Sequence, residues 1–167
     1  QNYTSGSWES NLIAYGNGSV ELYHDNSKVF ETITAGAKIY NLGSGEARLE
    51  IQGSEGNGAY LQLNADDGDD NADYWRAYAG TDGTFHIQNF ASGSWETNIK
   101  ATGNGAVELY YDNSLALNTH STGVSLRGSN NLCEGHFVPW ANNTWDLGTS
   151  TYRWRNIYTN DLNLSNE

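Results

Sequence analysis

One stretch of this chain occurs twice, and the repeat limits the possible folds more than any other feature of the sequence. Residues 5–39 align without a gap with residues 92–126 at an offset of 87, and 19 of the 35 aligned positions are identical. Because both copies must adopt the same local structure, the repeat predicts a chain built from similar modules. The match extends upstream, where residues 1–3 align with 88–90, so we expect the chain to start inside a repeat.

Each copy of the repeat carries strand and turn signals at fixed places. The Gly-Asn-Gly sequences at 16–18 and 103–105 predict tight hairpin turns, because Asn and Gly tolerate a positive φ. The Val-Glu-Leu-Tyr runs at 20–23 and 107–110 alternate apolar and polar residues, as half-buried strands do. An Asp-Asn-Ser turn follows each run, at 25–27 in the first copy. The repeat therefore predicts a series of short strands joined by tight turns.

Alternating runs continue outside the repeat. Residues 47–51, 59–63, 74–78 and 85–90 read as further strands, separated by Gly-rich or acidic segments. Strands that recur every 8–12 residues predict a sandwich, a barrel or a β-solenoid. No window of 11 or more residues has a helical apolar period, so we predict an all-β fold, in which 151–156 is the one stretch that could form a short helical turn.

The composition argues against a compact globule. Aliphatic residues are sparse, Met is absent, Gly numbers 19 and the formal net charge is -12. Such a balance is typical of disordered chains, but those lack aromatic residues, and this chain has 6 Trp and 11 Tyr. We therefore predict an ordered β protein that gains its core by stacking or by association of several copies.

The charge and the motifs exclude several classes of function. An acidic surface repels nucleic-acid phosphates and anionic lipids, and no apolar run is long enough for a membrane helix, so we predict no nucleic-acid partner and no membrane insertion. Cys133 is the only cysteine and is expected to be a small buried side chain; a thiol–imidazole pair with His136 is the disfavoured alternative. No nucleophile or phosphate-loop motif is present, so we predict no catalytic residues.

The acidic segment at 65–73 has two interpretations. Dense carboxylates are ligands that Ca²⁺ prefers, although the closing Glu of an EF-hand loop is missing. The favoured interpretation is a solvated turn whose Asp and Asn side chains satisfy the local backbone. The candidate calcium ligands of the alternative are Asp66, Asp67, Asp69 and Asp70.

The C-terminal segment contains a run of short polar–aromatic motifs: Asn-Thr-Trp-Asp-Leu-Gly at 143–148, Tyr-Arg-Trp at 152–154, Asn-Ile-Tyr at 156–158 and Asp-Leu-Asn-Leu-Ser at 161–165. In this pattern the segment resembles bacteriophage tail-fibre and tailspike proteins. In those proteins the pattern lies near the C-terminus, commonly ahead of an intramolecular chaperone or a short tip. Residues 107–114 with 122–126, and residues 69–76, are similar to shaft modules of the same proteins.

The resemblance implies an elongated repetitive β fibre that forms a parallel homotrimer with a shared axial core. It implies a virion component of the phage tail, outside the cell, that joins other virion tail proteins and contacts a glycan or protein receptor on the host surface. It divides the chain into the end of one shaft repeat (1–39), a full repeat (40–126) and a Trp-rich tip or pre-chaperone module (127–167).

The candidate receptor-binding residues are Trp140, Trp145 and Tyr152, near the expected tip. Their structural alternative is a cap over the trimer core. The predicted function is thus a non-enzymatic trimeric spacer that mediates host attachment. The alternative is a carbohydrate-binding or polysaccharide-degrading tailspike module, with Ca²⁺ as an optional ligand and Trp75 and Trp95 as stacking platforms. Hydrolysis needs two carboxylates on opposite sides of a sugar, and the acidic segment places its carboxylates in one loop.

Overall fold

A computed structural model describes residues 1–41 and 43–162, and every regular element in them is a β-strand or a short 3₁₀ turn. The predicted all-β class is therefore confirmed. The chain divides into two compact units, Gln1–Arg127 and Gly128–Glu167. Positions 163–165 of the C-terminal pattern lie outside the described residues. The three-module division and the fibre remain predictions.

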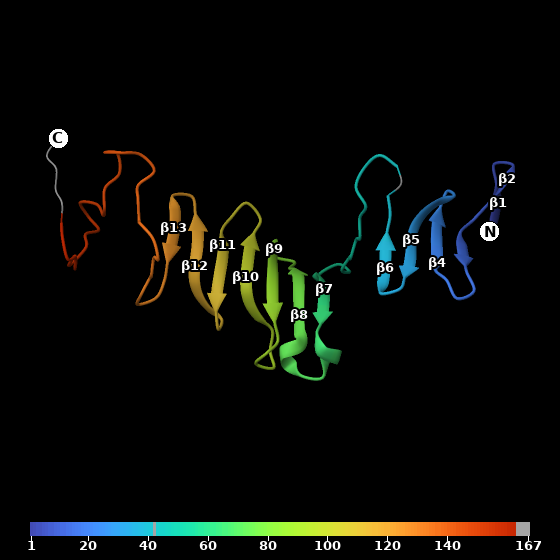
Figure 1. Ribbon diagram of the computed structural model, residues 1–167, viewed down its shortest axis with the longest axis horizontal. Helices are drawn as coiled ribbons and strands as arrows, with labels where there is room; N and C mark the ends of the chain where they lie inside the picture. The colour runs from blue at the N-terminus through green and yellow to red at the C-terminus, as the bar shows by residue number, and fades with distance from the viewer. Residues whose placement is uncertain (42, 163–167) are drawn as a thin grey trace. The chain divides into compact units, whose positions relative to one another are not determined.

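The first unit holds three antiparallel sheets, in which each strand pairs only with its neighbours in the sequence (Figure 1). The two-stranded sheet contains β1 (Asn2–Thr4) and β2 (Ser7–Glu9), and the four-stranded sheet contains β3 (Leu12–Ala14), β4 (Val20–His24), β5 (Ser27–Ile33) and β6 (Gly36–Ile39). The seven-stranded sheet contains β7 (Ala59–Asn64), β8 (Tyr74–Ala79), β9 (Thr84–Asn89), β10 (Glu96–Thr102), β11 (Val107–Tyr111), β12 (Ser114–His120) and β13 (Gly123–Leu126).

The repeat folds the same way twice. Strands β4, β5 and β6 correspond residue for residue with β11, β12 and β13 at the offset of 87. The pairing of Leu22 with Phe30 in the first copy recurs as the pairing of Leu109 with Leu117 in the second. A register shift of the β-bulge kind follows each of these pairs. The two copies thus share one local structure over these three strands.

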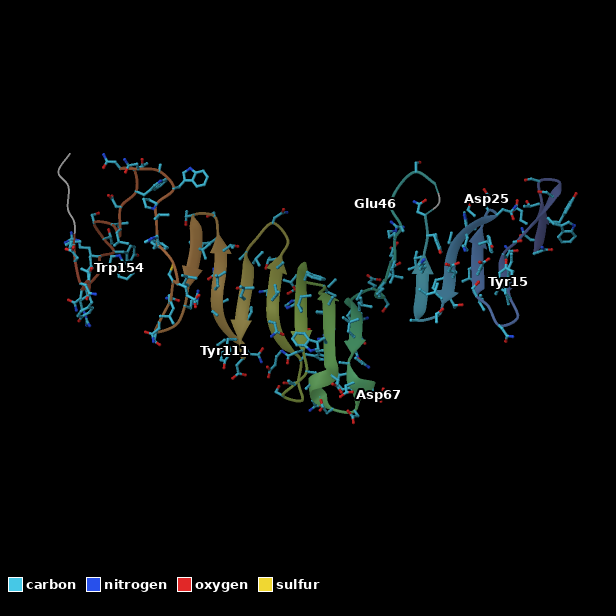
Figure 2. All side chains as sticks on the ribbon, viewed as in Figure 1. Tyr15, Asp25, Glu46, Asp67, Tyr111 and Trp154 are labelled. Atoms are coloured by element: carbon cyan, nitrogen blue, oxygen red, sulfur yellow. The ribbon has the colours of Figure 1, made fainter. Side chains whose placement is uncertain are left out.

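The turn between β4 and β5, which recurs between β11 and β12, explains why its Asp-Asn sequence is kept in both copies. Asp112 and Asn113 have φ angles of 48° and 54°, and Asp25 and Asn26 have 50° and 56° (Asp25 is labelled in Figure 2). Two consecutive positive φ angles define the hairpin turn whose twist suits the flanking strands, and Asn and Asp tolerate them. The Oδ1 of Asn113 also accepts a hydrogen bond from the backbone N–H of Thr97 at 3.2 Å.

Two predicted elements are wrong. Residues 47–51 alternate like a strand but pair with no other strand in the described chain, and Leu49 is 63% exposed. A strand needs a partner for its backbone groups, and the pattern of side chains does not supply one. The short helical turn considered at 151–156 is absent, and these residues form bends instead; the Oγ1 of Thr149 accepts the N–H of Tyr152 at 2.9 Å.

The chain has no buried apolar core in its described part. None of the hydrophobic side chains described is buried, and the buried residues are the polar Glu21, Thr84 and Gln88. Each sheet is therefore a single layer whose apolar face has no covering layer among the described residues. Cys133 is exposed, so the prediction of a small buried thiol is wrong; its segment has no strand that would enclose it.

Candidate functional site

A row of apolar side chains crosses the whole seven-stranded sheet. Residues that face each other on paired strands project from the same side of a sheet, so the register defines the row. The apolar row contains Leu61, Ala77, Ile87, Ile99, Leu109, Leu117 and Leu126. Leu61 is 47% exposed and Leu126 is 58% exposed. Ile99 and Leu109, in the middle of the sheet, are each 39% exposed, so the row is partly accessible between its edge strands as well.

The four-stranded sheet carries the same feature. Its register aligns Leu12, Leu22, Phe30 and Ile39 on one face. These positions are the repeat counterparts of Ile99, Leu109, Leu117 and Leu126. The repeat therefore keeps a large apolar residue on this face of every strand. In a single-layer sheet such a face is not buried, so it adds little to the stability of the lone chain.

The opposite face of the four-stranded sheet holds an ionic cluster. The ammonium of Lys28 pairs with Glu21 at 3.2 Å and also with Glu31, and the hydroxyls of Tyr23 and Tyr40 donate to these carboxylates. The Tyr23 hydroxyl lowers the pKa of Glu21, and the Lys28 ammonium lowers the pKa of Glu31. Both carboxylates are therefore charged at neutral pH. A glycosidase needs one carboxylic acid with a raised pKa, which this pair does not provide.

The second copy of the repeat keeps the glutamate but changes its partner. Glu108, the counterpart of Glu21, pairs with Lys100 of β10 at 3.0 Å, and this ammonium lowers the pKa of Glu108. The counterpart of Lys28 is Leu115. The cation thus approaches from the strand before β11 instead of the strand after it. Both copies neutralise the carboxylate, which is buried at Glu21 and half-buried at Glu108, as expected of an ion pair that stabilises the fold.

The acidic segment forms the connection between β7 and β8, as the favoured interpretation predicts. It contains two 3₁₀ turns, η1 (Asp66–Gly68) and η2 (Asn71–Asp73), with Asp67 at the end of the hairpin in Figure 2. Asp70 accepts the N–H of Ala72 at 2.8 Å, and Asp73 accepts the N–H of Asp70 at 3.3 Å. This reciprocal pair is a capping box, in which the carboxylates satisfy the backbone.

The predicted calcium ligands are only partly brought together. Carboxylate oxygens of Asp69, Asp70 and Asp73 lie within 4.8 Å of one another, and Asp66 and Asp67 are outside this group. Asp73 was missing from the predicted set because sequence spacing does not reveal the chain reversal between η1 and η2. Calcium binding remains a prediction, and the capping box already accounts for two of the three carboxylates.

The candidate receptor-binding residues do not form one site. Trp140 is 97% exposed, Trp145 is 65% exposed and Tyr152 is 80% exposed. Trp145 lines a shallow hollow of about 420 Å³ that includes Phe137 and Leu147 but neither Trp140 nor Tyr152. Receptor contact by these three residues remains a prediction. The alternative thiol–imidazole pair is not formed in the described residues, since the Cys133 thiol donates to the carbonyl oxygen of Gly135 at 3.2 Å.

Comparison with known proteins finds no matching family model, no matching curated protein and no matching solved structure. No helix in the described part of the chain is long and apolar enough to cross a membrane. The residues of the chain are therefore the basis for its function, and their most extensive feature is the uncovered apolar row.

Proposed function

We propose that this chain is a non-enzymatic structural subunit that associates with copies of itself as a parallel homotrimer. The trimer forms a fibre segment of a phage tail that serves as a spacer and attaches the virion to the host surface. The observation that carries this proposal is the uncovered apolar row on sheets whose chain has no buried hydrophobic side chain in its described part.

The exposed area supports association. The chain exposes 14270 Å². A compact monomer of 18.4 kDa is expected to expose about 8,200 Å². The excess, roughly 6,000 Å², is several times the ~800 Å² that each partner contributes to a standard stable interface. Burial of apolar surface contributes about 25 cal/mol per Å², so covering the row is the main gain open to this fold.

The repeat favours identical copies as the covering partners. The four-stranded sheet carries its aligned apolar residues at positions equivalent to those of the apolar row in the seven-stranded sheet. Parallel copies of the chain would therefore bring matching apolar residues together around a common axis. The charged clusters lie on the opposite faces, where they remain in water. Closed association also protects the exposed edge strands β7 and β13 from pairing with other molecules.

The threefold arrangement and the role in attachment are supported by the resemblance of the C-terminal pattern and the repeat to phage fibre proteins. Three copies also strengthen attachment, because a second and third weak contact to the same surface become intramolecular once the first has formed. The partners on this proposal are further copies of the chain, other tail proteins and a glycan or protein receptor.

Light scattering of the intact chain tests the assembly with two adjacent variants. Leu61→Asp places a charge on the apolar row, and Gln62→Asp places the same charge on the opposite face of the same strand. We expect a mass of about 55 kDa for three 18.4-kDa chains, lost in Leu61→Asp and kept in Gln62→Asp. A stable monomer with cooperative melting would overturn the assembly, and a dimer would overturn the threefold arrangement.

A further inference from the structure

Arg76 lies on the polar face of the seven-stranded sheet among aromatic rings. Its guanidinium carbon is 4.1 Å from the ring centre of Trp95, 4.8 Å from that of Tyr78 and 5.6 Å from that of Tyr60. A guanidinium over the face of a ring is attracted by the ring's negative π-surface. These four residues, the Arg76 cluster, come from β7, β8 and the segment before β10.

A series of hydrogen bonds holds Arg76 in place. Its Nε donates to the Oε1 of Gln88 at 2.7 Å, and the Nε2 of Gln88 donates to the Oγ1 of Thr97 at 3.2 Å. Gln88 is only 8% exposed, so its amide has little room to turn. The guanidinium is therefore fixed before any ligand arrives, which reduces the entropy lost on binding.

Arg76 has no carboxylate partner in spite of the acidic composition. The chain has 20 Asp and Glu against 8 Lys and Arg, yet no carboxylate oxygen in the described residues lies within the 4.0 Å of an ion pair with Arg76. A guanidinium has five N–H donors, and the bond to Gln88 uses one of them. The remaining donors are suited to an oxyanion from outside the chain.

We propose that the Arg76 cluster binds a sugar that carries a carboxylate, as a uronic acid does, within a surface glycan. The guanidinium pairs with both oxygens of the carboxylate. The ring of Tyr60, which is 49% exposed, offers an apolar surface to the C–H groups of the sugar. This assignment rests on the proposed function in one respect, because the assembly covers the apolar row and leaves the Arg76 face outward.

The net charge of -12 does not prevent binding of an acidic sugar. The residues that face Arg76 on the two neighbouring strands are the uncharged Gln62 and Gln88, and the rings of Trp95, Tyr78 and Tyr60 lie near its guanidinium. At physiological ionic strength the Debye length is about 8 Å, so more distant carboxylates of the chain are largely screened. The local environment of the guanidinium therefore decides the interaction.

Calorimetric titration of the intact chain with a galacturonic-acid trimer tests the site, with a neutral galactose trimer and inorganic phosphate as comparison ligands. We expect the acidic trimer to bind at least about tenfold more tightly than the neutral trimer, as charge-assisted hydrogen bonds require. Arg76→Gln abolishes this binding and Arg76→Lys weakens it. Arg48→Gln, which removes the same charge from an exposed position outside the strands, leaves it unchanged. Tyr60→Ala weakens binding and Tyr60→Phe retains it.

The outcomes separate this inference from the proposed assembly. Equal binding of the acidic and neutral trimers, loss of binding in Arg48→Gln, or phosphate binding as tight as that of the sugar overturns the acidic-sugar site. Light scattering of the same samples decides the rest: a trimer that binds no acidic sugar overturns the site alone, and a monomer that binds it overturns the assembly alone. If the circular dichroism spectrum shows that Arg76→Gln does not fold, the binding of the acidic trimer to Arg76→Lys and Tyr60→Ala tests the site instead.

Discussion

The asparagine of the Asp-Asn turn has two roles at the scale of one residue. Asn113 adopts a φ of 54°, which a residue such as Ala adopts only at a cost. Its side chain also satisfies the backbone N–H of Thr97, just as Asn26 satisfies the N–H of Ser10 at 2.8 Å. The turn thus joins neighbouring strands through its side chain as well as through its backbone.

Replacement of Asn113 separates these two roles. Asn113→Ala should lower the free energy of unfolding by about 2 kcal/mol, since it strains the left-handed backbone and removes the bond to Thr97. Asn113→Gly should lose only about 1 kcal/mol, because glycine accepts the φ and lacks only the side-chain bond. Urea denaturation at one protein concentration measures both. A glycine variant less stable than the alanine variant would contradict this account.

At the scale of the element, the two copies of the repeat show that strands tolerate different side-chain arrangements around one conserved carboxylate. Glu21 and Glu108 occupy equivalent places on β4 and β11, yet the lysine comes from β5 in the first sheet and from β10 in the second. Removing either lysine leaves a buried or half-buried carboxylate without its cation, which is more costly than losing an exposed ion pair.

The ion pair of the first copy indicates how the second copy can be stabilised after its lysine is removed. Lys100→Ile, which introduces the residue found at the equivalent position 13, should lower Tm because it leaves Glu108 without its cation. Adding Leu115→Lys, which places a lysine at the position equivalent to Lys28, should recover most of the lost Tm. Thermal melting of the single and double variants measures the recovery. If the second change lowers Tm further, the two sheets do not share one geometry on this face.

At the scale of the whole molecule, the proposed association of copies of the chain is opposed by electrostatic repulsion. Each copy carries -12, so bringing copies together costs repulsion, whereas covering the apolar row is favourable. Salt screens the repulsion and leaves the apolar gain in place. The proposed interface is apolar, so it has no ion pairs that salt would weaken.

Raising the salt concentration should therefore tighten the assembly. Light scattering during dilution should place the dissociation midpoint at a lower protein concentration in about 0.5 M than in about 0.05 M sodium chloride, where the Debye length exceeds 10 Å. Leu61→Asp should show weak assembly at both salt concentrations. Dissociation promoted by salt would instead indicate an interface held by ion pairs and would contradict the apolar row.

The sequence by itself determined the hairpins of this protein. Positive φ angles at Asp25 and Asn26, the register of Leu22 with Phe30 and the alternation of the repeat depend on residues close in the chain, so local chemistry was enough. The same reasoning predicted the turn at 65–73. It did not predict the Arg76 cluster, because Trp95 reaches Arg76 only through the pairing of β8, β9 and β10.

Only the tertiary structure decided which patterned segments become strands and how far they extend. Residues 47–51 alternate but lack a partner, so they form no strand. Strand β3 has three residues, whereas its repeat counterpart β10 has seven. The difference arises because β10 pairs with both β9 and β11, whereas β3 pairs in the described chain with β4 alone. A turn is set by the preferences of its own residues, but a strand ends where its neighbour no longer satisfies its backbone groups.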